Sequence, residues 1–300
     1  MKFQKFIEKY FLIDDPKTGA LVPFSFRPVQ AKYYEMLCND YSEEENFNGA
    51  RELILKARKE GFTSLILALF CADLIYNENP IRYLEISYKD DATKQHFRRA
   101  KTFILSYFRN KLQIDDNSKL EKQVFKSISE GSEFVLAHNG ASFYVGTAST
   151  RTGERGGTTQ GILFSEAAFY PSTGIINADE IIEGTRSMVA VGSGMVFLES
   201  TANGYNHYRR RWEQAKSGQT DYKPRFFSWK DFYTDVEFEK VKLGFSDKRL
   251  IPQEFPLTPD EAFLSSGSTF FDAVSLKWLD QECRKNPLRE GFLAADGKFI

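Results

Sequence analysis

The chain has 300 residues, of which 42% are hydrophobic and 27% are charged, as expected for a folded protein with one large domain or two small ones. The formal net charge of −1 shows no overall basic excess, so a nucleic acid would have to bind a local basic patch. The three cysteines are far apart and the three histidines lack metal-ligand spacing, which argues against a disulfide framework and a zinc site. Charges interrupt the apolar N-terminus, and no run of about 18 apolar residues occurs, so we expect neither a signal peptide nor a membrane span.

Helical and strand-like patterns alternate along most of the sequence. The expected helices are 1–11, 27–41, 62–76, 90–112 and 176–188. The expected strands are 50–57, 81–88, 161–170, 194–204 and 224–229, with a hairpin at 133–149 around an Asn-Gly turn. This order predicts an α/β fold with a mainly parallel, twisted sheet flanked by helices. Right-handed crossovers would bring the carboxyl ends of the strands to one edge, where such sheets bind ligands.

The sequence "LKARKEGFTS" (55–64) joins an apolar strand to an apolar helix and contains the residue types of a phosphate-binding loop. Such a loop needs backbone N–H groups, a cation, and a hydroxyl for magnesium. Gly61 would let the backbone approach the phosphates, with Thr63 and Ser64 as the hydroxyl-bearing residues after it.

The cation of this loop is not where the usual pattern G-x-x-x-x-G-K-[ST] has it, because Phe62 occupies the lysine position. Lys56, Arg58 or Lys59 would supply the charge instead, and Lys56 stands at the start of the loop. A solvated basic turn that caps a buried helix is the alternative interpretation.

A carboxylate closes the apolar strand in "GILFSEAAFY" (161–170). Glu166 at this position is suited to orienting a water molecule for attack on a γ-phosphate. Ser165 stands where such sites usually carry a magnesium-binding aspartate, and its hydroxyl would bind magnesium through water. An ordinary strand end with a Ser-Glu pair is equally consistent with this segment alone.

Three further segments carry candidate roles. In "ESTANG" (199–204), Thr201 and Asn203 could sense phosphate and move a neighbouring segment, although Asn-Gly is also a common turn. In "RTGERGG" (151–157), Arg155 could reach a neighbouring subunit's nucleotide as an arginine finger, or belong to an ordinary glycine-rich loop. In "FRPVQ" (26–30), Gln30, with Arg27 beside it, could bind an adenine edge or be a plain polar helix residue.

Together these segments resemble the ATPase half of the large terminase subunit of tailed bacteriophages, over roughly residues 20–272. "LKARKEGFTS" resembles the family's deviant Walker A loop, "ILFSEAAF" its Walker B motif, "ESTANGYNHYRRRW" its coupling motif, and "FRPVQ" its adenine motif. "RGGTTQGILFSE" carries an arginine–glycine pair at the family's spacing. Ser165 and Phe62 depart from the family's usual aspartate and lysine.

The resemblance implies a P-loop NTPase of the RecA-like (ASCE) kind that uses ATP and Mg²⁺. It implies an ATP-hydrolysing motor that moves double-stranded DNA into a procapsid, with the portal protein and the small terminase subunit as partners. We expect a homo-oligomeric ring in the host cell cytoplasm, transiently docked on the procapsid, and no membrane partner. The arginines of "YRRRW" (208–212) would contact DNA phosphates or form a solvated helix face.

The expected organisation is an N-terminal helical region with the adenine motif (1–45), the P-loop ATPase domain (46–250) and a linker or lid (251–300). No cluster of aspartates follows residue 272, so the family's C-terminal nuclease is not expected in this chain. A helicase-like DNA-remodelling ATPase and a nucleotide-binding regulator that does not hydrolyse ATP are the alternative functions.

Overall fold

The computed structural model describes residues 2–42, 46–148, 157–171, 177–190 and 192–264. The chain divides into two units, Met1–Ser266 and Gly267–Ile300, and the second lies outside the described residues. No helix of the described part is both long and apolar enough to cross a membrane.

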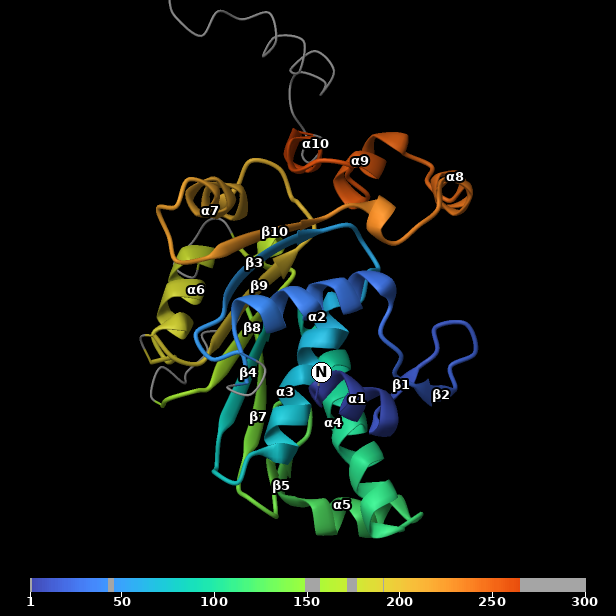
Figure 1. Ribbon diagram of the computed structural model, residues 1–300, viewed down its shortest axis with the longest axis vertical. Helices are drawn as coiled ribbons and strands as arrows, with labels where there is room; N and C mark the ends of the chain where they lie inside the picture. The colour runs from blue at the N-terminus through green and yellow to red at the C-terminus, as the bar shows by residue number, and fades with distance from the viewer. Residues whose placement is uncertain (1, 43–45, 149–156, 172–176, 191, 265–300) are drawn as a thin grey trace, which may run out of the picture. The chain divides into compact units, whose positions relative to one another are not determined.

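An eight-stranded sheet forms the centre of the first unit (Figure 1). The strand order is β10-β3-β9-β8-β4-β7-β6-β5, and every neighbouring pair from β10 to β7 is parallel. β6 and β5 extend the sheet in antiparallel pairings. The strands are β3 (Arg51–Lys56), β4 (Arg82–Ser87), β5 (Phe125–Ser129), β6 (Glu133–Leu136), β7 (Ser142–Thr147), β8 (Gly161–Ser165), β9 (Met195–Ser200) and β10 (Lys223–Phe227). The predicted α/β class with a mainly parallel sheet is confirmed.

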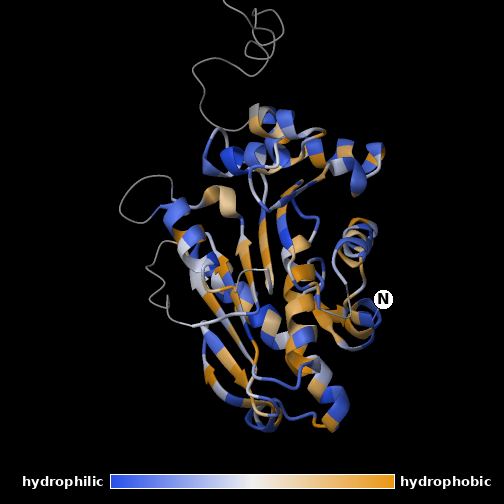
Figure 2. Ribbon diagram, turned by 60° about the vertical axis from the view of Figure 1, so that its left-hand side comes forward, coloured by the Kyte–Doolittle hydropathy of each residue, from blue (hydrophilic) through white to orange (hydrophobic). Residues whose placement is uncertain are grey.

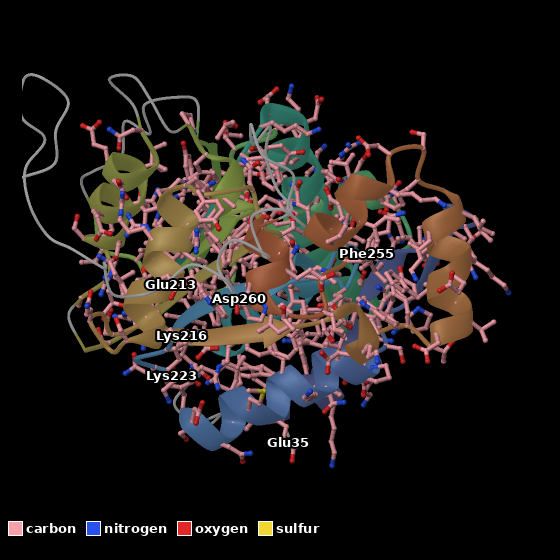
Figure 3. The ribbon with its side chains drawn as sticks, turned by 90° about the horizontal axis from the view of Figure 1, so that it is seen from above. Glu35, Glu213, Lys216, Lys223, Phe255 and Asp260 are labelled. Carbon is pink, nitrogen blue, oxygen red and sulfur yellow. The ribbon has the colours of Figure 1, made fainter. Side chains whose placement is uncertain are left out.

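Helices cover both faces of the sheet. The helices are α1 (Lys2–Tyr10), α2 (Pro28–Asp40), α3 (Phe62–Tyr76), α4 (Asp90–Leu112), α5 (Asn117–Val124), α6 (Ala178–Arg186), α7 (His207–Lys216), α8 (Asp235–Leu243), α9 (Ile251–Glu254) and α10 (Pro259–Leu264). One core holds buried residues of α1, α2, α3 and α4, and a second holds those of α6, α7 and α10. Viewed from above (Figure 3), α2 with Glu35 and α7 with Glu213 lie on opposite sides of β10.

Successive strand residues alternate between these two cores, as the two-residue period of a strand requires. Ile54 of β3 and Phe197 of β9 belong to the core on the α3 side, whereas Leu53 and Val196 belong to the other. The strands at the centre of the sheet are accordingly mostly apolar (Figure 2). The same alternation determines on which face of the sheet each polar side chain at a strand end lies. Only those on the α3 face can contact α3.

α3 packs against the sheet with almost its whole length buried. Its sequence, "FTSLILALFCADLIY", is apolar around the entire helix, which is typical of a helix enclosed in a core. Gly61 precedes it in the left-handed conformation with φ of +81°. The strand–turn–helix predicted for residues 50–76 is confirmed, and its turn lies at the carboxyl edge of the sheet.

Among the elements that were not predicted from the sequence, two add strands to the fold. The breaker-rich segment after α1 forms a short antiparallel hairpin of β1 (Leu12–Asp14) and β2 (Leu21–Pro23). Asp15 stabilises its turn by accepting hydrogen bonds from the Lys17 backbone N–H and the Thr18 hydroxyl. The second feature is the α5–β5 unit, which extends the antiparallel edge of the sheet.

Candidate functional site

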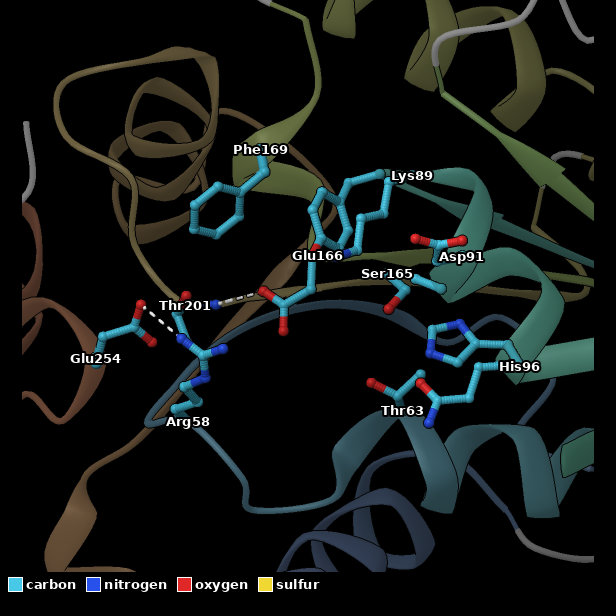
Figure 4. Close-up of a pocket in the computed structure, with 13 residues that line it drawn as sticks. Arg58, Thr63, Lys89, Asp91, His96, Ser165, Glu166, Phe169, Thr201 and Glu254 are labelled. Atoms are coloured by element: carbon cyan, nitrogen blue, oxygen red, sulfur yellow. Dashed lines mark hydrogen bonds and ion pairs between the residues drawn. The ribbon is translucent and has the colours of Figure 1, made fainter. Parts of the chain in front are cut away.

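A cavity of about 390 Å³ lies at the carboxyl ends of the central strands. Its lining includes Arg58 and Thr63 from the segment after β3, Ser165 and Glu166 from the end of β8, and Thr201 after β9. Figure 4 shows Thr63, Ser165 and Glu166 around this hollow, with Arg58 beside Glu254 and opposite Thr63 and Ser165. The structure thus brings together three segments that the sequence placed at predicted strand ends.

Lys56, the last residue of β3, is the cation that meets Glu166. Its ammonium lies 2.9 Å from Oε1 of Glu166 and 3.1 Å from Oε2 of Glu199, and the residue is only 4% exposed. Burial by itself lowers the pKa of Lys56, but the two carboxylates outweigh burial and hold the pKa above its usual range. Lys56 therefore stays charged within the site.

The other two candidate cations of the loop face outward. The Arg58 side chain is 57% exposed and pairs with Glu254 of α9 at 3.1 Å, while also lining the cavity. Lys59 is exposed and has a left-handed backbone with φ of +67°. Among the three, Lys56 alone is buried against the acidic residues of the site.

Glu166 begins a short 3-10 helix, η1 (Ala167–Phe169), directly after β8, and its side chain is 27% exposed. Its Oε2 accepts hydrogen bonds from the Ser200 hydroxyl at 3.3 Å and the Thr201 backbone N–H at 3.2 Å. Its backbone is left-handed, with φ of +50°, which is costly for a residue other than glycine. Several contacts thus hold the carboxylate at the cavity wall.

Glu199 is the second acidic residue that contacts Lys56, and the sequence analysis gave it no role. It is fully buried in β9, and its Oε1 accepts hydrogen bonds from the Thr63 hydroxyl at 2.5 Å and the Ser165 hydroxyl at 2.8 Å. Burial raises the pKa of Glu199, but Lys56 and the two hydroxyls outweigh burial, so the pKa lies below its usual value. An acidic residue two positions after Phe197 on an otherwise apolar strand was the available signal, because both residues share the α3 face.

Packing holds Gly61 and Phe62 of the predicted phosphate loop in place. A side-chain β-carbon at Gly61 would lie 2.7 Å from Nε2 of Gln30, so the close approach as well as the positive φ favour glycine. The Phe62 ring is fully buried, with ring centroids 5.3 Å from Tyr33 and 4.7 Å from Phe227. Phe62 therefore anchors the start of α3 in the core and does not take the place of a phosphate-binding lysine.

A second cavity, of about 240 Å³, is lined by Arg27, Gln30, Gly61 and Ser64 together with residues of the β1–β2 hairpin. Gln30 is buried; its Oε1 accepts from the Arg27 backbone N–H at 2.9 Å, and its Nε2 donates to the Gly61 carbonyl at 2.8 Å. The Arg27 guanidinium donates to the Lys59 carbonyl at 2.6 Å. The predicted adenine-binding residues thus contact the predicted phosphate loop directly, and a glutamine amide keeps one N–H and one lone pair beyond these bonds.

The remaining predicted residues lie beside the cavity or outside the described part. Thr201 contacts Glu166 through its backbone N–H, and the Asn203 amide donates to the Ala168 carbonyl at 3.2 Å. Arg155 lies outside the described residues. The segment after β9 is thereby tied to the segment after β8.

No group of three or more His, Cys, Asp or Glu side chains suited to hold a metal occurs among the residues that the structure describes. A magnesium ion in a nucleotide site needs fewer protein ligands, because phosphate and water oxygens complete its shell. The Thr63 and Ser165 hydroxyls line the cavity, with the ionised Glu199 behind them. These oxygen groups fit a hard cation that arrives with a nucleotide.

No model of a protein family matches the sequence, and no curated protein matches it. Among solved structures, the large terminase ATPase domain of Thermus phage P74-26 matches with a TM-score of 0.50 and 14% identity, over 68% of this chain and 86% of that domain. The large terminase of bacteriophage HK97 matches with a TM-score of 0.54 and 16% identity, over 88% of this chain and 50% of that one. The large terminase of another, thermophilic bacteriophage matches with a TM-score of 0.50 and 11% identity, over 77% and 53%. The chain spans about half the length of these last two proteins. Its fold is that of the ATPase domain of a phage large terminase.

Proposed function

We propose that this chain is the ATP-hydrolysing motor part of a terminase that moves double-stranded viral DNA into a procapsid. The observation that supports it most directly is the ion pair of the buried Lys56 with Glu166, whose side chain lines, together with Thr63, a cavity at the ends of parallel strands. This is the position at which open α/β sheets bind nucleotides. The fold shared with large terminase ATPase domains agrees with it.

In this proposal the triphosphate lies against the backbone of the loop after β3 and the N-terminus of α3, where free N–H groups favour anions. Lys56 provides the buried positive charge, and Arg58 adds a second one at the exposed side. The adenine occupies the smaller cavity, where Gln30 and Arg27 also hold the loop in position. Both cavities reach the first turn of α3, the larger at Thr63 and the smaller at Gly61 and Ser64.

Glu166 positions the attacking water, and its partial exposure beside the cavity leaves the carboxylate accessible. Thr63 and Ser165 would hold Mg²⁺, which would neutralise charge on the phosphate oxygens. Loss of the γ-phosphate would change what Glu166 contacts, and the Thr201 N–H bonded to Glu166 would pass this change to the coupling segment. Asn203 belongs to the same segment.

Assembly completes the proposed site. Arg155 of a neighbouring subunit would act on the phosphoryl group, which makes a homo-oligomeric ring necessary for full activity. The ring would act in the host cell cytoplasm, docked on the portal protein of the procapsid and supplied with DNA by the small terminase subunit. In the structure, Arg210 and Arg211 of α7 pair with Asp179 of α6, and Arg211 also pairs with Glu183. These two arginines would have to exchange those partners to contact DNA phosphates.

The test compares ATP hydrolysis by wild type, Glu166→Gln and Glu35→Gln, each with and without double-stranded DNA and procapsids. Glu35→Gln makes the same chemical change on the exposed face of α2. We expect Glu166→Gln to lower turnover by at least about 100-fold, because a positioned general base contributes that much, while Glu35→Gln retains wild-type turnover. Equal turnover in both variants would refute the role of Glu166.

The assay also separates the alternative functions. Hydrolysis that increases with procapsids supports the packaging motor, whereas strand separation by the purified protein would indicate a helicase-like enzyme. ATP binding without turnover in assembled rings would indicate a regulator.

A further inference from the structure

The cluster around Glu199 holds a buried carboxylate that the proposed reaction has not used. Ser165 and Glu199 are direct register partners on neighbouring parallel strands, so their side chains leave the same face of the sheet side by side. Both lie on the α3 face, and both reach the first turn of α3 at Thr63. A carboxylate on β9 therefore occupies the space next to the position at which β8 carries a serine.

We propose that Glu199 is the acidic residue of the magnesium site, supplying from β9 the carboxylate that β8 lacks at position 165. This inference rests on the proposed function, because it assigns the metal-positioning residue of the same nucleotide site. Glu199 acts through Thr63, whose hydroxyl it binds, and is therefore a positioning residue.

The hydrogen-bond direction supports this role. The Thr63 hydroxyl has one proton, and it donates that proton to Glu199 at 2.5 Å. The lone pairs of its oxygen are then left for a cation at the cavity, which Thr63 lines. The Ser165 hydroxyl donates to the same carboxylate oxygen and also lines the cavity. One buried anion thus orients two hydroxyl oxygens toward the same space.

The second carboxylate oxygen of Glu199 lies next to the positive charge of Lys56. Glu199 Oε2 makes no hydrogen bond within the described part of the chain, but it lies 3.1 Å from the Lys56 ammonium. Glu199 thus places a carboxylate, with Lys56 as its ion-pair partner, in a fully buried position behind the two hydroxyls, and a serine at position 165 does not provide such a group. A purely structural ion pair with Lys56 would explain the 3.1 Å contact but not the convergence of both hydroxyls.

The test measures ATPγS affinity by titration calorimetry in Mg²⁺ and in EDTA, so it needs no turnover. For wild type we expect tighter binding in Mg²⁺. Glu199→Gln should reduce this Mg²⁺-dependent gain by about 10-fold or more, since outer partners of metal ligands contribute on that order, while affinity in EDTA changes much less. Glu52→Gln, which alters another buried carboxylate of the same sheet, should keep the wild-type gain.

A double variant that moves the carboxylate from β9 to β8 tests whether Mg²⁺-dependent binding can be restored. The double variant Ser165→Asp with Glu199→Ser should recover most of the Mg²⁺-dependent gain that Glu199→Ser alone loses. If Glu199→Gln does not fold, Glu199→Asp serves instead, because it keeps a negative charge in the cluster and withdraws it from Thr63.

The experiment distinguishes failure of this inference from failure of the proposed function. Glu199→Gln that keeps the wild-type Mg²⁺ gain, or loses EDTA affinity by the same factor, would overturn the inference and leave the ATPase proposal standing. Failure of the wild-type protein to bind ATPγS at all would refute the proposed function itself.

Discussion

Strand β3 carries a buried cluster of charged residues at each end. The cluster at its start is closed, because its carboxylate is fully hydrogen-bonded within the protein, and the cluster at its end is open to a cavity. At its start, Glu52 accepts four hydrogen bonds, from the Tyr33 and Tyr41 hydroxyls and from Nε and an NH2 nitrogen of Arg225. These bonds fill the four lone-pair positions of a carboxylate. At its end, Lys56 joins Glu166 and Glu199, and Glu166 remains 27% exposed at a cavity.

The difference separates a structural cluster from a candidate site. Burial raises the pKa of Glu52 above its usual value, and the surrounding donors oppose this without reversing it. In the Lys56 cluster the opposing charges prevail, and the pKa of Glu199 falls below its usual value. The hydrogen bonds of the closed cluster are all made within the protein, whereas the open one presents the Glu166 carboxylate to a cavity that could hold phosphates.

The largest expected effect comes from removing the cation of each cluster. Lys56→Met and Arg225→Met should each lower the free energy of unfolding by about 3–5 kcal/mol, because each leaves a buried carboxylate without its counter-charge. Only Lys56→Met should also abolish ATPγS binding. Urea denaturation and calorimetric titration of both variants provide the comparison. Equal ATPγS affinity in the two variants would contradict the distinction between the clusters.

Much of this comparison was accessible from the sequence, because it depends on local pattern. The apolar run before Lys56 and the carboxylate Glu166 in the expected strand at 161–170 predicted which strand ends border the cavity. The partnership of Glu199 with Ser165 depends on β9 and β8 being neighbours in one register, which no local pattern specifies. Local pattern likewise could not show that Phe62 faces a core built from Tyr33 and Phe227, far away in the sequence.

Phe62 is connected to the closed cluster, because it packs on Tyr33, whose hydroxyl donates to Glu52. Phe62→Ala should lower the free energy of unfolding by about 3 kcal/mol through the cavity it leaves. Phe62→Lys restores the residue type usual in phosphate loops but places a charge in the same core, so it should not rescue Lys56→Met. Denaturation of both single variants, with ATPγS titration of the double variant, tests this. Recovered binding in the double variant would show that position 62 faces the phosphates.

Glu60 is a third carboxylate near this end of β3, and it belongs to neither cluster. It is fully buried, and neither of its oxygens has a hydrogen-bond partner within the described part of the chain. Burial raises the pKa of Glu60 from 4.5 to about 9, against the opposing charge of Lys56. Glu60 is therefore protonated in the folded protein at neutral pH and ionised in the unfolded chain.

The sign of the resulting pH dependence follows from linkage. Between the unfolded pKa of 4.5 and the folded pKa of about 9, the folded state binds the extra proton, so stability falls as pH rises. Glu60→Gln removes this loss because glutamine stays neutral in both states. We expect the variant to gain at least about 1 kcal/mol over wild type between about pH 5 and pH 8, measured by urea denaturation. Glu35→Gln, on the exposed face of α2, controls for the general effect of removing a carboxylate. A gain that does not grow with pH would show that Glu60 is ionised in the folded protein and shares the Lys56 charge, which would make it a member of the open cluster.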